Sequence, residues 1–121
     1  MKKASIFTAV LFMQVISSCN TKESNPLLYG EWRGAEWLIE GSASNRNVAE
    51  TYFSFDPGGN YSFGYGGTIE KGTYKVENDM LFTKPEGQAE IMVKISKLTN
   101  DSLVFDMNRG GTVEVLTLLK K

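Results

Sequence analysis

The segment Phe53-Ser54-Phe55-Asp56-Pro57-Gly58-Gly59-Asn60-Tyr61 has the pattern of a β-hairpin. Side chains two residues apart in a strand point to the same face, so Phe53 and Phe55 share one side of the first arm. Pro57 sets the backbone angle φ that opens a tight turn, and glycine accepts the positive φ that completes it. We therefore expect an antiparallel strand pair with aromatic rings gathered on one face.

The same alternation of apolar and polar residues continues on both sides of this hairpin. The expected strands cover residues 30–39, 49–55, 60–65, 71–76, 80–83, 91–96, 102–107 and 113–119. About eight short strands at a spacing of roughly ten residues are typical of an all-β sandwich or barrel. Their links are short turns, which favour an antiparallel up-and-down order, and closure removes the exposed edges of such a sheet. The predicted fold is an eight-stranded barrel or half-open barrel.

The first expected strand leaves one geometric question open. Trp32 and Trp37 are five residues apart, so in a regular strand they face opposite sides of the sheet. A β-bulge at Gly34 would return both rings to one face. After this strand, residues 41–47 form a polar loop rich in Gly, Ser and Asn, the longest in the expected domain.

The N-terminal segment has the pattern of an export signal. Lys2 and Lys3 precede an apolar run over residues 4–16 that is shorter than a membrane-spanning helix requires. Ser17 and Ser18 then lead into Cys19, which resembles the lipobox of bacterial lipoproteins, although Ile16 replaces the usual Leu. This resemblance implies that residues 1–18 are a signal peptide with a helical apolar part, removed by cleavage, and that Cys19 is lipidated.

The lipobox resemblance also divides the chain and gives it an address. Residues 19–27 are predicted to be the lipidated cysteine and a flexible tether, and residues 28–121 the barrel domain, about 100 residues in size. Asn20 stands where an Asp signals inner-membrane retention in such lipoproteins. The expected location is therefore the outer membrane, facing the periplasm or the cell surface.

Composition excludes several function classes. The net charge is −1 with no basic cluster, so we expect no nucleic-acid partner. The chain has no histidine and a single cysteine, which removes the usual general base and the usual metal ligands. Aspartates lie mainly in turns, and Glu50, Glu70 and Glu114 are expected on solvent-facing strand positions. We therefore predict no enzyme activity, no metal site and no cofactor.

Several motifs together resemble small lipocalin-like domains of bacterial lipoproteins. The motifs are Leu28-Tyr29-Gly30-Glu31-Trp32, the 53–61 hairpin, Gly72-Thr73-Tyr74-Lys75-Val76 with Met80-Leu81, and the segment 95–105. In that family the Trp of the Gly-x-Trp opening plugs the floor of the barrel, which implies this position for Trp32. Most such domains have no assigned activity, so the resemblance implies a fold and a lipid anchor more than a function.

Eight aromatic residues are the candidate ligand-binding set. They are Trp32, Phe53, Phe55, Tyr61, Phe63, Tyr65, Tyr74 and Phe105. The rings either line a cup for a small apolar or amphipathic ligand, with loop 41–47 as its lid, or simply fill the core, because an eight-stranded barrel has little internal space. Both interpretations are consistent with the sequence.

The function expected first is a ligand-binding module on a lipid anchor. The alternative is a protein-interaction module, such as an envelope-complex subunit or an inhibitor of a periplasmic enzyme, built on a solid barrel. It rests on apolar residues expected on the outer face, namely Tyr52, Val104, Leu116 and Leu118. The same residues would also serve dimerisation.

Overall fold

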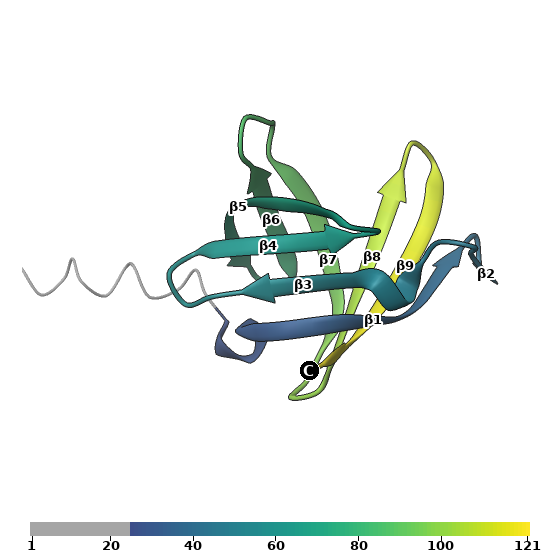
Figure 1. Cartoon of the computed structure of the whole chain (residues 1–121), viewed down its shortest axis with the longest axis horizontal. Coiled ribbons are helices and arrows are strands. Elements are labelled where there is room, and N and C mark those ends of the chain that lie inside the picture. Colours follow the sequence, from purple (N-terminus) through teal and green to yellow (C-terminus); the bar gives the residue numbers. More distant parts are fainter. Residues whose placement is uncertain (1–24) are drawn as a thin grey trace, which may run out of the picture.

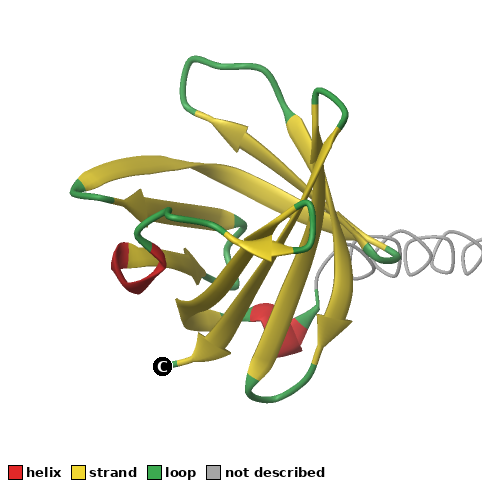
Figure 2. Ribbon diagram, turned by 90° about the vertical axis from the view of Figure 1, so that its right-hand side faces the viewer, coloured by secondary structure: helices red, strands yellow, loops and turns green. Residues whose placement is uncertain are grey.

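A computed structural model describes residues 25–121. These residues form a closed eight-stranded antiparallel barrel, supplemented by one very short strand (Figure 1). Figure 2 shows the strands wrapped around a common axis, with two short 3₁₀ turns, η3 (Pro26–Leu28) and η4 (Val48–Glu50), beside them. The predicted barrel is confirmed, and it is closed. The predicted signal peptide (1–18), Cys19 and residues 20–24 of the predicted tether lie outside the described residues.

The strands follow one another around the barrel in chain order. They are β1 (Gly30–Ile39), β2 (Ser42–Ala43), β3 (Thr51–Phe55), β4 (Asn60–Tyr65), β5 (Thr68–Glu77), β6 (Met80–Pro85), β7 (Ile91–Leu98), β8 (Ser102–Arg109) and β9 (Thr112–Lys120). Each strand from β3 to β8 pairs with the next, and β1 pairs with β3 on one side and β9 on the other. This order is the up-and-down meander that the short turns predict. The β2 strand only folds back on the end of β1.

The β3–β4 hairpin forms for the reasons read from its sequence. Phe55 pairs with Tyr61 across the strands, so their side chains enter the same face. The Asp56 carboxylate accepts hydrogen bonds from the backbone N–H groups of Gly58 and Asn60, both at 2.9 Å. Gly59 completes the turn with φ of +90°, a conformation that other residues rarely adopt.

One end of the barrel, here called the floor, is sealed. Trp32 and Leu28 are fully buried there, and the indole Nε1 of Trp32 donates to the carbonyl of Leu28 at 2.9 Å. The Lys120 ammonium lies 4.4 Å from the Trp32 ring centroid and donates to the carbonyl of Tyr29 at 2.8 Å. The η3 turn and the end of β9 thus both contact Trp32 at the floor.

A β-bulge in β1 settles the question of the two tryptophans. The pairing with β9 shifts register between Gly34 and Glu36, so that Trp32 faces Lys120 and Trp37 faces Leu116. Both rings consequently point into the barrel. Gly34 is required beside the bulge, because a Cβ there would lie 2.6 Å from the carbonyl oxygen of Val48 on η4.

The expected facing of β9 is wrong. Leu116 and Leu118 were expected on the outer face, but they are buried in the interior at 1% and 0% exposure. Val113 and Leu119, on the opposite face of the strand, are about half exposed. The β3 strand also begins later than expected, at Thr51, because Ala49 belongs to η4.

Candidate functional site

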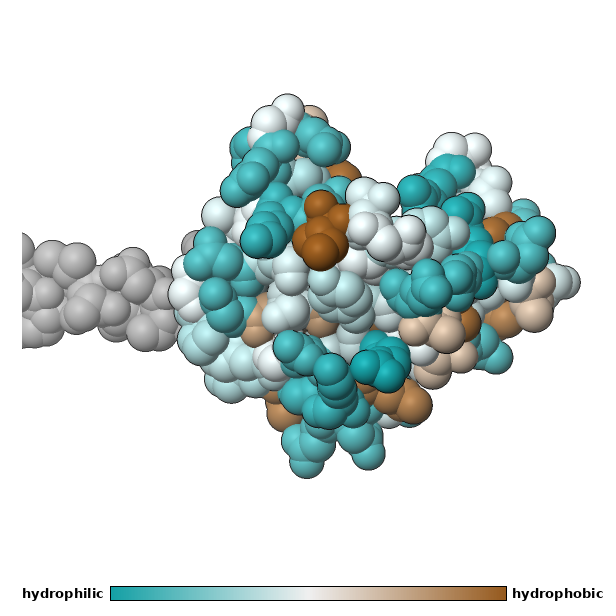
Figure 3. Space-filling model, viewed as in Figure 1, coloured by the Kyte–Doolittle hydropathy of each residue, from teal (hydrophilic) through white to brown (hydrophobic). Residues whose placement is uncertain are grey.

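The barrel interior is divided into a filled half and a hollow half. Toward the floor, the space is occupied by buried side chains including Trp32, Phe55, Leu103 and Leu118. Toward the opposite end, here called the mouth, lies a cavity of about 350 Å³. Figure 3 shows the surface hollowed between the tips of the β6–β7 and β8–β9 connections. The aromatic set is therefore divided: some of its rings fill the core toward the floor, and others border the cavity toward the mouth.

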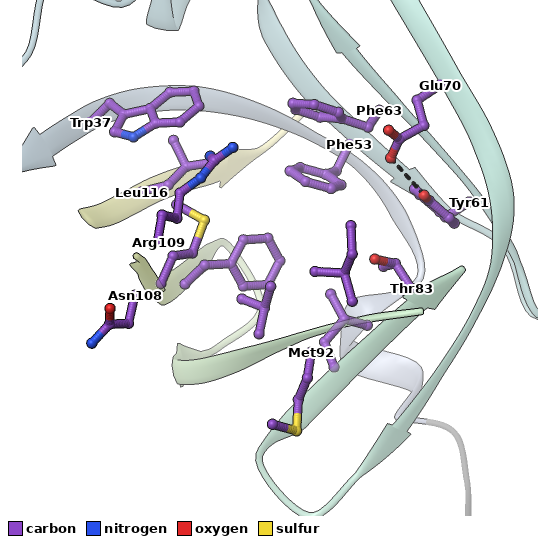
Figure 4. A pocket seen from close by; sticks show the side chains of 15 residues that line it. Trp37, Phe53, Tyr61, Phe63, Glu70, Thr83, Met92, Asn108, Arg109 and Leu116 are labelled. Atoms are coloured by element: carbon purple, nitrogen blue, oxygen red, sulfur yellow. Dashed lines mark hydrogen bonds between the residues drawn. The ribbon is translucent and has the colours of Figure 1, made fainter. Parts of the chain in front are cut away.

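Stacked aromatic rings form one wall of the cavity. Phe53 and Phe63 are cross-strand partners on β3 and β4, and their rings stack with centroids 4.6 Å apart and planes inclined by 27°. Phe105 on β8 meets Phe53 edge to face at 5.3 Å. Offset and edge-to-face contacts of this kind are the favoured geometries for aromatic pairs. The rings stabilise one another, and all three line the cavity. Figure 4 shows Phe53 and Phe63 side by side in its wall.

A hydrogen-bonded carboxylate stands beside the aromatic wall. Glu70 on β5 lines the cavity, although a solvent-facing position was expected, and its Oε2 accepts a bond of 2.7 Å from the Tyr61 hydroxyl (Figure 4). Burial raises the pKa of Tyr61, and the adjacent Glu70 carboxylate raises it further. The phenol therefore stays protonated and remains a hydrogen-bond donor to Glu70. Thr83 on β6 contributes a further hydroxyl to the lining.

A second inward carboxylate lies at the seam between β1 and β9. Glu114 was expected on the solvent face but is 3% exposed. Its Oε1 accepts a hydrogen bond of 2.8 Å from Nε1 of Trp37. Arg46 and Arg109 lie 3.6 and 3.9 Å from its two oxygens. Glu114 is thus a buried charge with partners of opposite sign on two sides, the condition under which such burial is tolerated.

The 41–47 loop, expected to be a lid, is attached to this seam. The Arg46 guanidinium lies 5.1 Å from the centroid of the Trp37 ring, in addition to its ion pair with Glu114. Trp37 in turn meets Tyr65 edge to face at 5.9 Å. These contacts hold the loop against the side of the mouth, and Arg46 itself does not line the cavity.

The structure brings together half of the eight predicted aromatic residues. Phe53, Tyr61, Phe63 and Phe105 line the cavity. The other four serve elsewhere: Trp32 at the floor, Phe55 and Tyr74 in the filled half, and Tyr65 beside Trp37. Cys19 lies outside the described residues.

Sequence reasoning missed five lining residues that matter for chemistry. They are Trp37, Glu70, Thr83, Arg109 and Leu116. One signal was available for Glu70, because it precedes Gly72, Tyr74 and Val76 in the same two-residue alternation. The charge of Glu70 favoured a solvent-facing position, whereas its place in the alternation put it on the same face as Tyr74 and Val76, which is the interior.

Two further properties of residues 25–121 bear on the site. Within this range no three His, Cys, Asp or Glu side chains are grouped so that they could hold a metal ion. No helix in this range is long and apolar enough to cross a membrane.

A sealed floor, a closed meander of eight strands and an apolar cavity below an open mouth define a calyx-shaped β-barrel. The chain belongs to the lipocalin-like domain family, whose model matches residues 28–105. No match to the chain is found among curated proteins.

Solved structures with the same fold come from Bacteroides. An uncharacterized protein from Bacteroides eggerthii is similar with a TM-score of 0.62 and 15% identity, over 78% of this chain and 99% of that one. A lipocalin-like protein from Bacteroides uniformis is similar with a TM-score of 0.57 and 17% identity, over 74% of this chain and 96% of that one. At these identities the likeness concerns the fold.

Proposed function

We propose that this protein is a lipid-anchored envelope lipoprotein whose barrel binds a small apolar or amphipathic molecule at its mouth. The observation that carries the proposal is the cavity of about 350 Å³ in the mouth half of the barrel. This size lies at the lower end of the range for small-molecule sites. The proposed role is binding, without catalysis or a cofactor.

The composition of the cavity walls supports this ligand class. Phe53, Phe63 and Leu116 provide apolar surface, and a few polar groups stand at fixed positions among them. Sites for small ligands usually combine a mainly apolar lining with a small number of placed polar groups. A ligand with an apolar body and one or two polar atoms matches this combination.

The membrane anchor is supported by the sequence. Lys2 and Lys3, the apolar run over 4–16 and the placement of Cys19 directly after Ser17-Ser18 form the pattern. An outer-membrane location, facing the periplasm or the surface, follows from Asn20 by the same resemblance.

The alternative of a protein-interaction module on a solid barrel has lost much of its support. Two of the four residues on which it rested, Leu116 and Leu118, lie in the interior. Tyr52 and Val104 remain at the outer face and are only partly exposed. The barrel is also hollow toward its mouth.

Native mass spectrometry of the purified protein tests the binding role. We expect a small molecule retained in a one-to-one complex, and its loss in Val93→Phe, which places a ring in the cavity. Val104→Phe, on the outer face of β8, is the matched control and retains the molecule. A bare mass, together with no thermal shift from a panel of lipids and small aromatic compounds, would contradict the proposal.

Radiolabelling tests the anchor separately. Cells expressing the protein and fed labelled palmitate are expected to incorporate label into the wild type and not into Cys19→Ser, which removes the only thiol of the chain. Equal labelling of both forms, or no label in either, would count against lipidation at Cys19.

A further inference from the structure

The two carboxylates inside the barrel have different electrostatic surroundings. Glu114 is flanked by Arg46 and Arg109 at 3.6 and 3.9 Å. Glu70 takes part in none of the ion pairs within 4.0 Å found among residues 25–121. Within the same residues its Oε2 accepts the Tyr61 hydroxyl, and its Oε1 accepts no hydrogen bond. Glu70 is therefore a cavity-lining carboxylate with spare acceptor capacity and no protein cation beside it.

The surroundings of Glu70 are aromatic. Its cross-strand partner on β4 is Phe63, which stacks on Phe53, and Tyr61 lies two residues before Phe63 on the same face. The faces of aromatic rings carry negative charge density and attract cations within about 6 Å. A carboxylate next to such faces favours a positively charged group over a neutral or negative one.

Arg109, the other charged residue of the lining, does not neutralise the charge of Glu70. Arg109 projects from the wall opposite Glu70, at the end of β8 (Figure 4). Its side chain is 57% exposed and lies 3.9 Å from Oε1 of Glu114. Its charge therefore faces water and the Glu114 carboxylate, whereas Glu70 stands among rings.

We propose that the cavity selects an apolar molecule carrying a protonated amine, with Glu70 as the counter-charge and the Phe53, Phe63 and Phe105 rings around the apolar body. This inference rests on the proposed binding function and names the ligand class for the same site. The ammonium donates to the carboxylate of Glu70, and the bond from Tyr61 keeps that carboxylate oriented toward the cavity.

Three probes with one apolar body and different head groups test the inference. They are 1-naphthylmethylamine, 1-naphthylmethanol and 1-naphthoate, titrated into the purified protein by calorimetry at pH 7. We expect the amine to bind at least about tenfold more tightly than the alcohol, and the carboxylate to bind most weakly. Glu70→Gln should remove the preference for the amine over the alcohol, because the counter-charge at the cavity wall is lost. Glu77→Gln, on the same strand but at its exposed end, should leave all three affinities unchanged.

The outcomes separate this inference from the function on which it rests. Equal affinities for the amine and the alcohol would overturn the amine class and leave cavity binding intact. Tighter binding of the carboxylate, abolished in Arg109→Gln, would also overturn it and assign the selectivity to Arg109. No binding of any probe would count against the cavity function itself. The ranking in the wild-type protein decides the question even if Glu70→Gln does not fold.

Discussion

Trp37 on β1 donates a hydrogen bond of 2.8 Å from its indole Nε1 to Oε1 of Glu114 on β9. The two residues are 77 positions apart in the sequence, and the bond crosses the seam where the first strand meets the last. Arg46 and Arg109 surround the same carboxylate. The buried side chain of Glu114 therefore contacts three parts of the barrel: the seam between β1 and β9, the mouth, and the 41–47 loop.

Removing this carboxylate should destabilise the barrel. Glu114→Ala leaves the Trp37 N–H without its acceptor and Arg46 without its counter-charge, so the free energy of unfolding should fall by about 1–3 kcal/mol in urea denaturation. Glu31→Ala is the control, because that carboxylate pairs with Lys121 on the exposed surface at 3.4 Å. It should cost less than about 0.5 kcal/mol. Equal losses would show that the seam contact contributes no more than a surface pair.

The bulge predicts a marked intolerance at Gly34. A methyl group there would approach the Val48 carbonyl oxygen to 2.6 Å and the Val48 Cγ2 to 2.9 Å, so Gly34→Ala must displace η4 from β1. We expect a loss of about 1–3 kcal/mol in the free energy of unfolding. Gly58→Ala meets nothing closer than 3.4 Å and should be nearly neutral. A neutral Gly34→Ala would mean that η4 does not pack as described.

Phe53 and Phe55, on the same face of β3, allow a test of the division of the interior into a filled half and a hollow half. Phe55 lies in the filled half at 2% exposure, and truncation to Ala should cost about 3–5 kcal/mol because it leaves a void. Phe53 borders the cavity, so Phe53→Ala enlarges an existing space and should cost clearly less. Urea denaturation measures both losses. The reverse order would indicate that the mouth half is packed as tightly as the floor half.

Alkaline pH should weaken the fold through Tyr74. Burial raises the pKa of its phenol from 10.0 to about 12, with smaller contributions from Tyr29 and Asp56. The folded state therefore holds the proton more tightly than the unfolded chain does. The resulting stabilisation is complete below pH 10 and is lost as the pH rises from 10 to 12.

The matched variant for this effect is Tyr74→Phe. It loses the hydrogen bond of 2.6 Å from the phenol to the Asp56 carbonyl, so it should be less stable at neutral pH. Its stability should also decline less steeply between pH 10 and 12, because the contribution of Tyr74 is gone. The remaining decline would come from Tyr61, whose pKa is also raised by burial. Parallel curves for the two proteins in a pH series of urea melts would argue against the raised pKa.

The alternation of apolar residues was sufficient to predict the strands and their order. Local turn chemistry, as in Asp56–Asn60, defines each hairpin, and consecutive hairpins leave little freedom in the order of strands. Closure and the bulge at Gly34 depend instead on pairing between β1 and β9. Contacts between residues so distant in the chain have no signature in a local pattern.

The candidate site was harder to predict because both faces of β9 are apolar. Val113, Val115 and Leu119 form one row, while Leu116 and Leu118 form the other between Glu114 and Lys120. The two charged residues made the second row look solvent-facing. Glu114 and Lys120 nevertheless share the inner face with these leucines, because each charged residue lies at one end of the barrel. Glu114 contacts Trp37 at the mouth, and Lys120 lies over Trp32 at the floor.

The way the chain enters the barrel has a consequence for its orientation. Residues Pro26–Leu28 lie at the floor, where Lys120 donates to the Tyr29 carbonyl. Cys19 precedes Asn25 by six residues, a span of at most about 20 Å. Given a lipid on Cys19, the sealed end is held close to the bilayer and the open end points away from it. Under the proposed binding role, the barrel would then take up a ligand from the surrounding water and not directly from the bilayer.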